Sequence, residues 1–184
     1  EVQKRIASWM RTAVGVIESS HIRVMRIADN MRNVAVTEGD KVEAQIKFGW
    51  EVDAYPVNEI ADAVNQVSKG DTDALVEEYY DKYDILLEGR DADEFRRHVA
   101  VQAQIEIGFE RFLEEKNYQA IVTHFGDLGA LKQLPGLAIQ RLMEKGYGFG
   151  AEGDWKTAAM VRLMKIMTAG MKDAKGTSMM EDYT

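Results

Sequence analysis

Apolar residues fall into two alternating patterns along this chain. In the longer stretches they recur every three or four positions, the spacing of an amphipathic helix, and these stretches are residues 3–19, 37–47, 58–69, 72–83, 93–115, 133–145 and 155–169. Between them lie shorter apolar runs typical of strands: residues 23–27, 50–57, 118–125 and 147–152. Strands that alternate with helices predict an α/β fold, a parallel sheet flanked by helices.

Two local signals refine this prediction. The run 50–57 alternates apolar and polar residues and contains Pro56, which favours an edge strand. Near the end of the chain, a strand is expected to finish at Glu152, and Asp154 can cap the next helix by accepting hydrogen bonds from its first N–H groups. That helix carries an apolar stripe formed by Met160, Leu163, Met164 and Met167, and Gly170 is suited to end it.

Two glutamates are expected to meet at one edge of the sheet. A second short strand leads to Glu181, and the segment after Gly170 can span about 40 Å, enough to return along a helix that rises about 22 Å. Parallel strands lie about 4.8 Å apart, so Glu152 and Glu181 would emerge together at the carboxyl edge, where such sheets bind ligands. Two close carboxylates favour a magnesium, calcium or manganese ion between them. The alternative is a pair of solvated glutamates beside loops.

Longer segments carry a more specific signal. They are Gln133–Met143, Gly146–Ala159, Met180–Thr184, Asp29–Arg32, Val34–Lys41 and Ala44–Trp50. Together they resemble the bacterial L-arabinose isomerase family nearly end to end, most weakly between Asp53 and Arg97. The matching segments are long and ungapped and include rare residues such as the Trp in Glu152-Gly-Asp-Trp-Lys-Thr157, which makes the resemblance specific.

This resemblance implies a Rossmann-like central domain of the L-arabinose/L-fucose isomerase type within a much longer enzyme. We expect residues 1–172 to form that domain and residues 173–184 to begin the following C-terminal domain. The implied enzyme is an intramolecular oxidoreductase, an aldose–ketose isomerase of arabinose catabolism that interconverts L-arabinose and L-ribulose through an ene-diol, with manganese(II) as cofactor. The resemblance also implies a cytoplasmic homo-oligomer, a hexamer.

The same resemblance assigns roles to individual residues. Glu152 and Glu181 match two glutamates that bind the metal and perform the acid/base work, and Met31 and Phe125 match residues that line the sugar pocket. The family's other two metal ligands are histidines of the following domain. None of the chain's own histidines matches them: His21, His98 and His124. The isolated chain is therefore expected to be inactive.

Some positions depart from the family pattern, so the sequence does not determine which sugar is the preferred substrate. Ile27-Ala28 stands where the family usually has Phe-Gly, Gly126 where it has Glu, and Gly129-Ala130 where it has a bulkier residue and Gly. One alternative is therefore a related isomerase that prefers another aldose, such as D-galactose. Another, from a different class, is a non-catalytic sugar-binding or assembly domain.

Composition narrows the remaining possibilities. The net charge of −8 argues against binding to nucleic acid, which needs a basic face. The chain has no cysteine, no signal-peptide pattern and no apolar run long enough to cross a membrane. Gly148–Gly153 fits the pattern G-x-G-x-x-G, but a helix precedes it where a dinucleotide-binding motif requires a strand, so we reject that interpretation.

Overall fold

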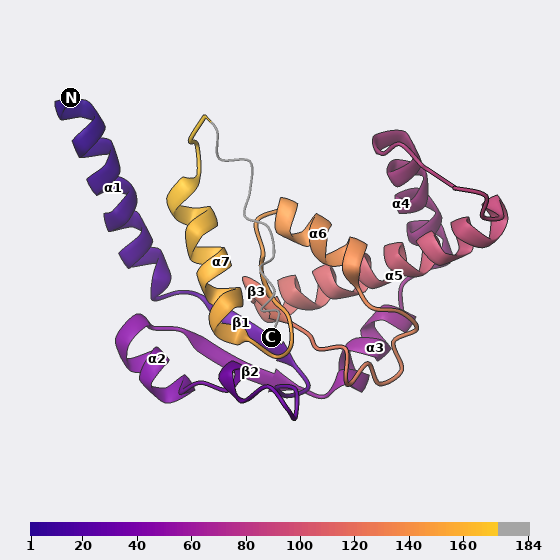
Figure 1. Cartoon of the computed structure of the whole chain (residues 1–184), viewed down its shortest axis with the longest axis horizontal. Coiled ribbons are helices and arrows are strands. Elements are labelled where there is room, and N and C mark those ends of the chain that lie inside the picture. The colour runs from indigo at the N-terminus through magenta and orange to yellow at the C-terminus, as the bar shows by residue number, and fades with distance from the viewer. Residues whose placement is uncertain (173–184) are drawn as a thin grey trace.

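The computed structural model describes residues 1–172, so the strand expected before Glu181 lies outside the described residues. The helices are α1 (Val2–Ser19), α2 (Lys41–Phe48), α3 (Val57–Asn65), α4 (Lys69–Lys82), α5 (Ala92–Lys116), α6 (Gly136–Glu144) and α7 (Trp155–Thr168), with a short 3-10 helix, η1 (Ala35–Thr37). The strands are β1 (Arg23–Ile27), β2 (Glu51–Tyr55), β3 (Ala120–Val122) and β4 (Gly148–Gly150). Figure 1 shows the helices arranged around the strands, which confirms the predicted α/β class.

The strands of the described part form one parallel sheet in the order β2-β1-β3-β4. In its register Met25 of β1 lies between Asp53 of β2 and Ile121 of β3, and Ile121 is opposite Phe149 of β4. The prediction that residues 50–57 form an edge strand is confirmed. Because all strands point the same way, their carboxyl ends lie at one edge.

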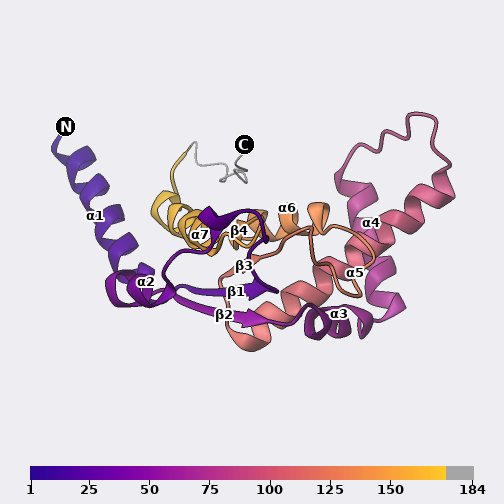
Figure 2. The ribbon, with the colours of Figure 1, turned by 60° about the horizontal axis from the view of Figure 1, so that its bottom comes forward.

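Side chains alternate between the two faces of the sheet, as strand geometry requires. Met25, Ile121 and Phe149 pack with α3, α5 and α6, whereas Val24 and Val122 pack with the side of α7 that carries Trp155, Ala158 and Ala159. Figure 2 shows α7 and α5 on opposite sides of the strands. The sheet is therefore buried on both faces, which is usual for parallel sheets.

Glycines on β4 let α7 lie directly on the strand. A Cβ atom at Gly148 would be 2.1 Å from the carbonyl oxygen of Ala158, and one at Gly150 would be 2.0 Å from that of Asp154. Only a residue without a Cβ fits at either position. The first two glycines of the rejected dinucleotide pattern thus serve helix–strand packing.

We expect Gly150→Ala to lower the free energy of unfolding by about 1–3 kcal/mol, because a helix backbone would have to move away from the sheet. Gly136→Ala is the matched control, since nothing lies within 4 Å of a Cβ at that position. The control should change stability by no more than about 1 kcal/mol. Urea-induced unfolding measures both variants, and equal effects would contradict this account of the packing.

Parts of two predicted apolar stripes are exposed. On α7, Met160 and Met164 are 47% and 42% exposed, because the close approach to β4 leaves room only for small residues such as Ala158. Met167 instead contacts α1, where a Cβ at Gly15 would be 2.6 Å from its Cγ atom. On α1 the predicted apolar row is mostly exposed; its members are Ile6, Met10, Val14 and Ile17.

Several predicted boundaries need correction. The strands expected over residues 118–125 and 147–152 pair over only three residues each, because the chain turns into loops where the sheet ends. Helix α4 begins at Lys69, since Ser68 caps it by accepting a hydrogen bond from the Asp71 N–H (3.1 Å). Helix α6 begins only after Pro135, which occupies its N-cap position.

A buried ionic cluster joins α4, α5 and α6. The fully buried Glu106 carboxylate accepts hydrogen bonds from the Tyr79 hydroxyl (2.5 Å), Arg141 Nε (2.7 Å) and Lys145 Nζ (3.0 Å). Burial, together with the bond to Glu106, raises the pKa of Tyr79. This cluster attaches the projecting α4–α5 arm, visible in Figure 1, to the body of the domain. Among the described residues, no helix combines the length and apolarity that a bilayer crossing requires.

Candidate active site

Three loops meet at the carboxyl edge of the sheet. They follow β1, β3 and β4, and hydrogen bonds join them: the Met31 N–H donates to the Glu152 carbonyl (3.3 Å), and the Gly153 N–H donates to the Thr123 carbonyl (3.2 Å). A Cβ at Gly153 would lie 2.4 Å from the Asn30 Cα atom, so glycine allows the β4 loop to touch the β1 loop. The edge is therefore a connected platform.

Glu152 has an unusual backbone conformation at the centre of this platform. Its φ of 56° lies in the left-handed region that non-glycine residues seldom adopt. Asp154 fixes the turn that follows, because its side chain accepts hydrogen bonds from the N–H groups of Lys156 (3.0 Å) and Thr157 (3.2 Å). The predicted cap is thus confirmed. Residues held in such strained conformations concentrate at functional sites.

A cavity of about 160 Å³ opens beside Glu152. Its lining comes from the β3 loop, the start of α6 and the end of β4: Thr123, His124, Phe125, Leu134, Pro135, Gly136, Ile139, Phe149, Ala151 and Glu152. Glu152 is half-buried, and Phe125 is 53% exposed at this opening. The cavity combines apolar walls with a few polar groups, as small-molecule sites do.

The structure brings together some of the predicted site residues. Glu152 and Phe125 line one cavity, and Met31 adjoins Glu152 through a backbone hydrogen bond without lining that cavity. Glu181 lies outside the described residues. The expected meeting of Glu152 with Glu181 therefore stays a prediction.

Ala28 shows how the β1 loop accommodates its departure from the family pattern. Its φ of 64° is left-handed, the conformation that glycine favours, and its N–H donates to the Tyr55 carbonyl at 2.8 Å. The chain thus keeps a turn suited to glycine although alanine occupies the position.

Two residues at this edge were not identified as site residues from the sequence. Arg26 on β1 is 1% exposed and forms ion pairs with Asp29 (3.0 Å) and Glu38 (3.7 Å), which anchors the β1 loop. An arginine inside an apolar strand was the available signal. His124 is 8% exposed two residues after β3; its place in the predicted strand 118–125 allowed it to point toward the pocket, but packing in the protein interior was the expected role.

Glu152 is the candidate metal ligand among the described residues. None of the ion pairs or side-chain hydrogen bonds within residues 1–172 occupies the Glu152 carboxylate, so its oxygens can bind a hard divalent cation. The described part of the chain contains no group of three or more His, Cys, Asp or Glu side chains placed to hold a metal. A complete coordination shell would need ligands in addition to these residues.

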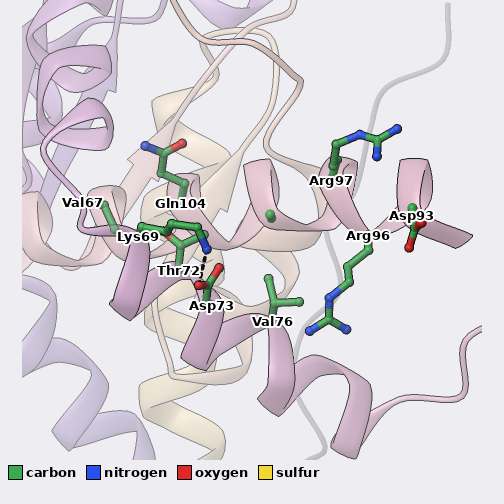
Figure 3. A pocket seen from close by; sticks show the side chains of 10 residues that line it. Val67, Lys69, Thr72, Asp73, Val76, Asp93, Arg96, Arg97 and Gln104 are labelled. Atoms are coloured by element: carbon green, nitrogen blue, oxygen red, sulfur yellow. Dashed lines mark hydrogen bonds and ion pairs between the residues drawn. The ribbon is translucent and has the colours of Figure 1, made fainter.

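A larger cavity of about 590 Å³ lies between α4 and α5 (Figure 3). Of its charged side chains, Lys69 pairs with Asp73 and Arg96 pairs with Glu77, whereas Asp93 and Arg97 form no ion pair within the described residues. None of the residues that line this cavity was predicted as a site residue. The cavity beside Glu152 is therefore the better candidate for an active site.

Comparison with known proteins identifies the family of this chain. A family model described as the L-arabinose isomerase central domain matches residues 23–170. Similar relatives named L-arabinose isomerase come from Geobacillus thermodenitrificans (strain NG80-2), 54% identical, from Enterobacter sp. (strain 638), 52%, and from Halalkalibacterium halodurans, 50%. Each match covers all of this chain and 36% of the relative's length. The chain therefore belongs to the L-arabinose isomerase family and corresponds to its central domain.

Proposed function

We infer that the protein containing this chain is an aldose–ketose isomerase that interconverts L-arabinose and L-ribulose. The observation that carries this proposal is the half-buried Glu152 at the carboxyl edge of the sheet, lining a cavity next to Phe125. Membership of the family supports the same reaction, since the relatives carry that name over the full span of the chain. The activity belongs to a protein longer than the part described.

The reaction moves a proton between adjacent carbons of the open-chain sugar through an ene-diol. A carboxylate is a suitable acid/base for this step, and Glu152, with Glu181 as its proposed partner, would take the proton from one carbon and return it to the other. A divalent ion held by Glu152 and Glu181, manganese(II) by family resemblance, would polarise the sugar carbonyl. Phe125 would pack against the carbon skeleton of the sugar, and Met31 would close the pocket from the β1 loop.

Gly126 favours a second candidate substrate. The family usually has Glu here, and a Cβ at this position would lie 3.2 Å from Nδ1 of His124, a residue that lines the cavity. Without a side chain at Gly126 there is more space beside His124. That space would admit an aldose with one more carbon, such as D-galactose. The substrate preference of the enzyme is therefore part of the test.

We predict that the full-length protein with Mn²⁺ forms ketose from L-arabinose and that the 184-residue chain alone forms none, because it lacks two of the four expected ligands. A colorimetric ketose assay with L-arabinose and D-galactose measures both forms. Faster turnover of D-galactose would favour the second candidate. Saturable sugar binding without metal-dependent turnover would indicate a binding or assembly domain instead.

We also propose that the protein assembles as a homo-oligomer, a hexamer by family resemblance. Exposed apolar side chains on α1 support association, since Trp9 is 71% and Ile17 61% exposed. Light scattering of the full-length protein would give the number of subunits.

A further inference from the structure

His124 is a buried polar side chain whose hydrogen bonds are not accounted for. It is 8% exposed, and neither Nδ1 nor Nε2 has a hydrogen-bond partner among residues 1–172. Buried polar groups in folded proteins are nearly always paired, because an unpaired one loses its bonds to water without replacement. The exception therefore requires an explanation.

The position of His124 explains why its ring has no partner among the residues that the structure describes. It lies two residues after the end of β3 and lines the same cavity as Glu152, Thr123 and Phe125. The rest of the lining is mainly apolar, with Leu134, Ile139 and Phe149 among its members. A molecule that fills this cavity would meet the imidazole ring and the Glu152 carboxylate together.

Gly126, two positions after His124, leaves one side of the imidazole ring free of a side chain. A Cβ at Gly126 would be 3.2 Å from Nδ1 and 3.6 Å from Cε1 of His124. Any larger side chain would crowd that side of the ring, and a carboxylate would offer it a partner within the protein. Glycine at this position does neither.

We propose that His124 binds a hydroxyl group of the sugar in this cavity, an inference that rests on the proposed isomerase function. An imidazole ring carries an N–H donor and, in its neutral form, an acceptor nitrogen. A sugar hydroxyl both donates and accepts, so it can satisfy either nitrogen. His124 is thus a substrate-binding residue that orients the sugar relative to Glu152.

The test combines binding and stability measurements on the full-length protein with Mn²⁺. His124→Phe keeps an aromatic ring of similar size and removes both nitrogens. We expect it to raise the dissociation constant for L-arabitol, an unreactive sugar alcohol, by roughly three- to tenfold, the effect of losing one or two hydrogen bonds. The melting temperature of the sugar-free variant should stay the same or rise, because an unpaired polar group has been replaced by an apolar one.

Two further variants make the result specific. His124→Gln retains a donor and an acceptor and should recover part of the lost affinity. His98→Phe makes the same chemical change at an exposed histidine of α5 and should leave the dissociation constant unchanged. A purely structural role for His124 predicts the opposite pattern, a lower melting temperature with unchanged affinity, and that pattern would overturn the inference.

Turnover of the wild-type protein separates this inference from the proposed function. An active wild type whose His124→Phe variant binds L-arabitol equally well would overturn the role of His124 alone. An inactive wild type that binds L-arabitol through His124 would overturn the isomerase function and keep the binding role. A wild type that neither binds nor turns over sugar would overturn both.

Discussion

Glu152→Gln is expected to lower kcat for L-arabinose by roughly 10²–10⁴-fold in the full-length protein, the usual contribution of a positioned acid/base. The amide has nearly the same shape as the carboxylate, but it cannot accept the proton and is a weaker ligand for a divalent ion. The fold should persist, because the backbone of Glu152 makes the hydrogen bond to Met31 and the side chain is only half-buried. Ketose formation under saturating sugar and Mn²⁺ measures the loss.

Glu115→Gln is a suitable control for this result. Glu115 is an exposed residue of α5 whose ion pair is with its neighbour Lys116, so its amide should leave kcat unchanged. Both variants should unfold at the wild-type temperature. Wild-type turnover by the Glu152 variant would show that the acid/base group lies elsewhere.

Glu106→Gln is expected to lower the free energy of unfolding by about 3 kcal/mol. The change leaves Arg141, which is nearly buried, facing a neutral amide, and it replaces one of the two acceptor oxygens by an NH2 group that can only donate. We expect the lower end of the usual range for a broken buried pair, because Lys145 is 36% exposed. Urea-induced unfolding followed by circular dichroism gives the difference.

Glu110→Gln is the matched control on the same helix, one turn further along. Glu110 also pairs with Lys145 (2.6 Å), but its side chain is 25% exposed, so water can replace part of the lost interaction. Its cost should stay near or below about 1 kcal/mol. Equal losses from the two variants would mean that burial of the Glu106 cluster contributes nothing beyond an ordinary ion pair.

The sequence predicted the order of elements and several local details. The strand at residues 23–27 and the Asp154 cap were predicted at the correct residues, since an apolar run and a capping side chain are local signals. The resemblance directed attention to Glu152 and Phe125, which the structure places on one cavity. The confirmed strand and cap depend on short-range chemistry, whereas the roles of Glu152 and Phe125 rest on long matching segments and stay predictions.

The errors share a physical cause, which is tertiary contact. The apolar spacing on α7 did not show that Met160 and Met164 would be exposed, because the glycines of β4 bring α7 so close to the sheet that small residues such as Ala158 face it. His124 and Arg26 could not be assigned because their burial depends on the loops and helices around them. A pattern along one segment does not show which neighbour will cover it.

The strand order has a consequence for how the domain forms on the ribosome. β1 lies at the centre of the sheet, between β2, which follows it closely, and β3, which begins only after α5; the bond from the Arg23 N–H to the Gln119 side chain joins residues 96 positions apart. At about 5–20 residues per second, β1 would wait roughly 5–20 seconds for this partner. During that time the edge of β1 that later pairs with β3 would be exposed. A chaperone that binds unpaired strand edges of nascent chains would act in that interval.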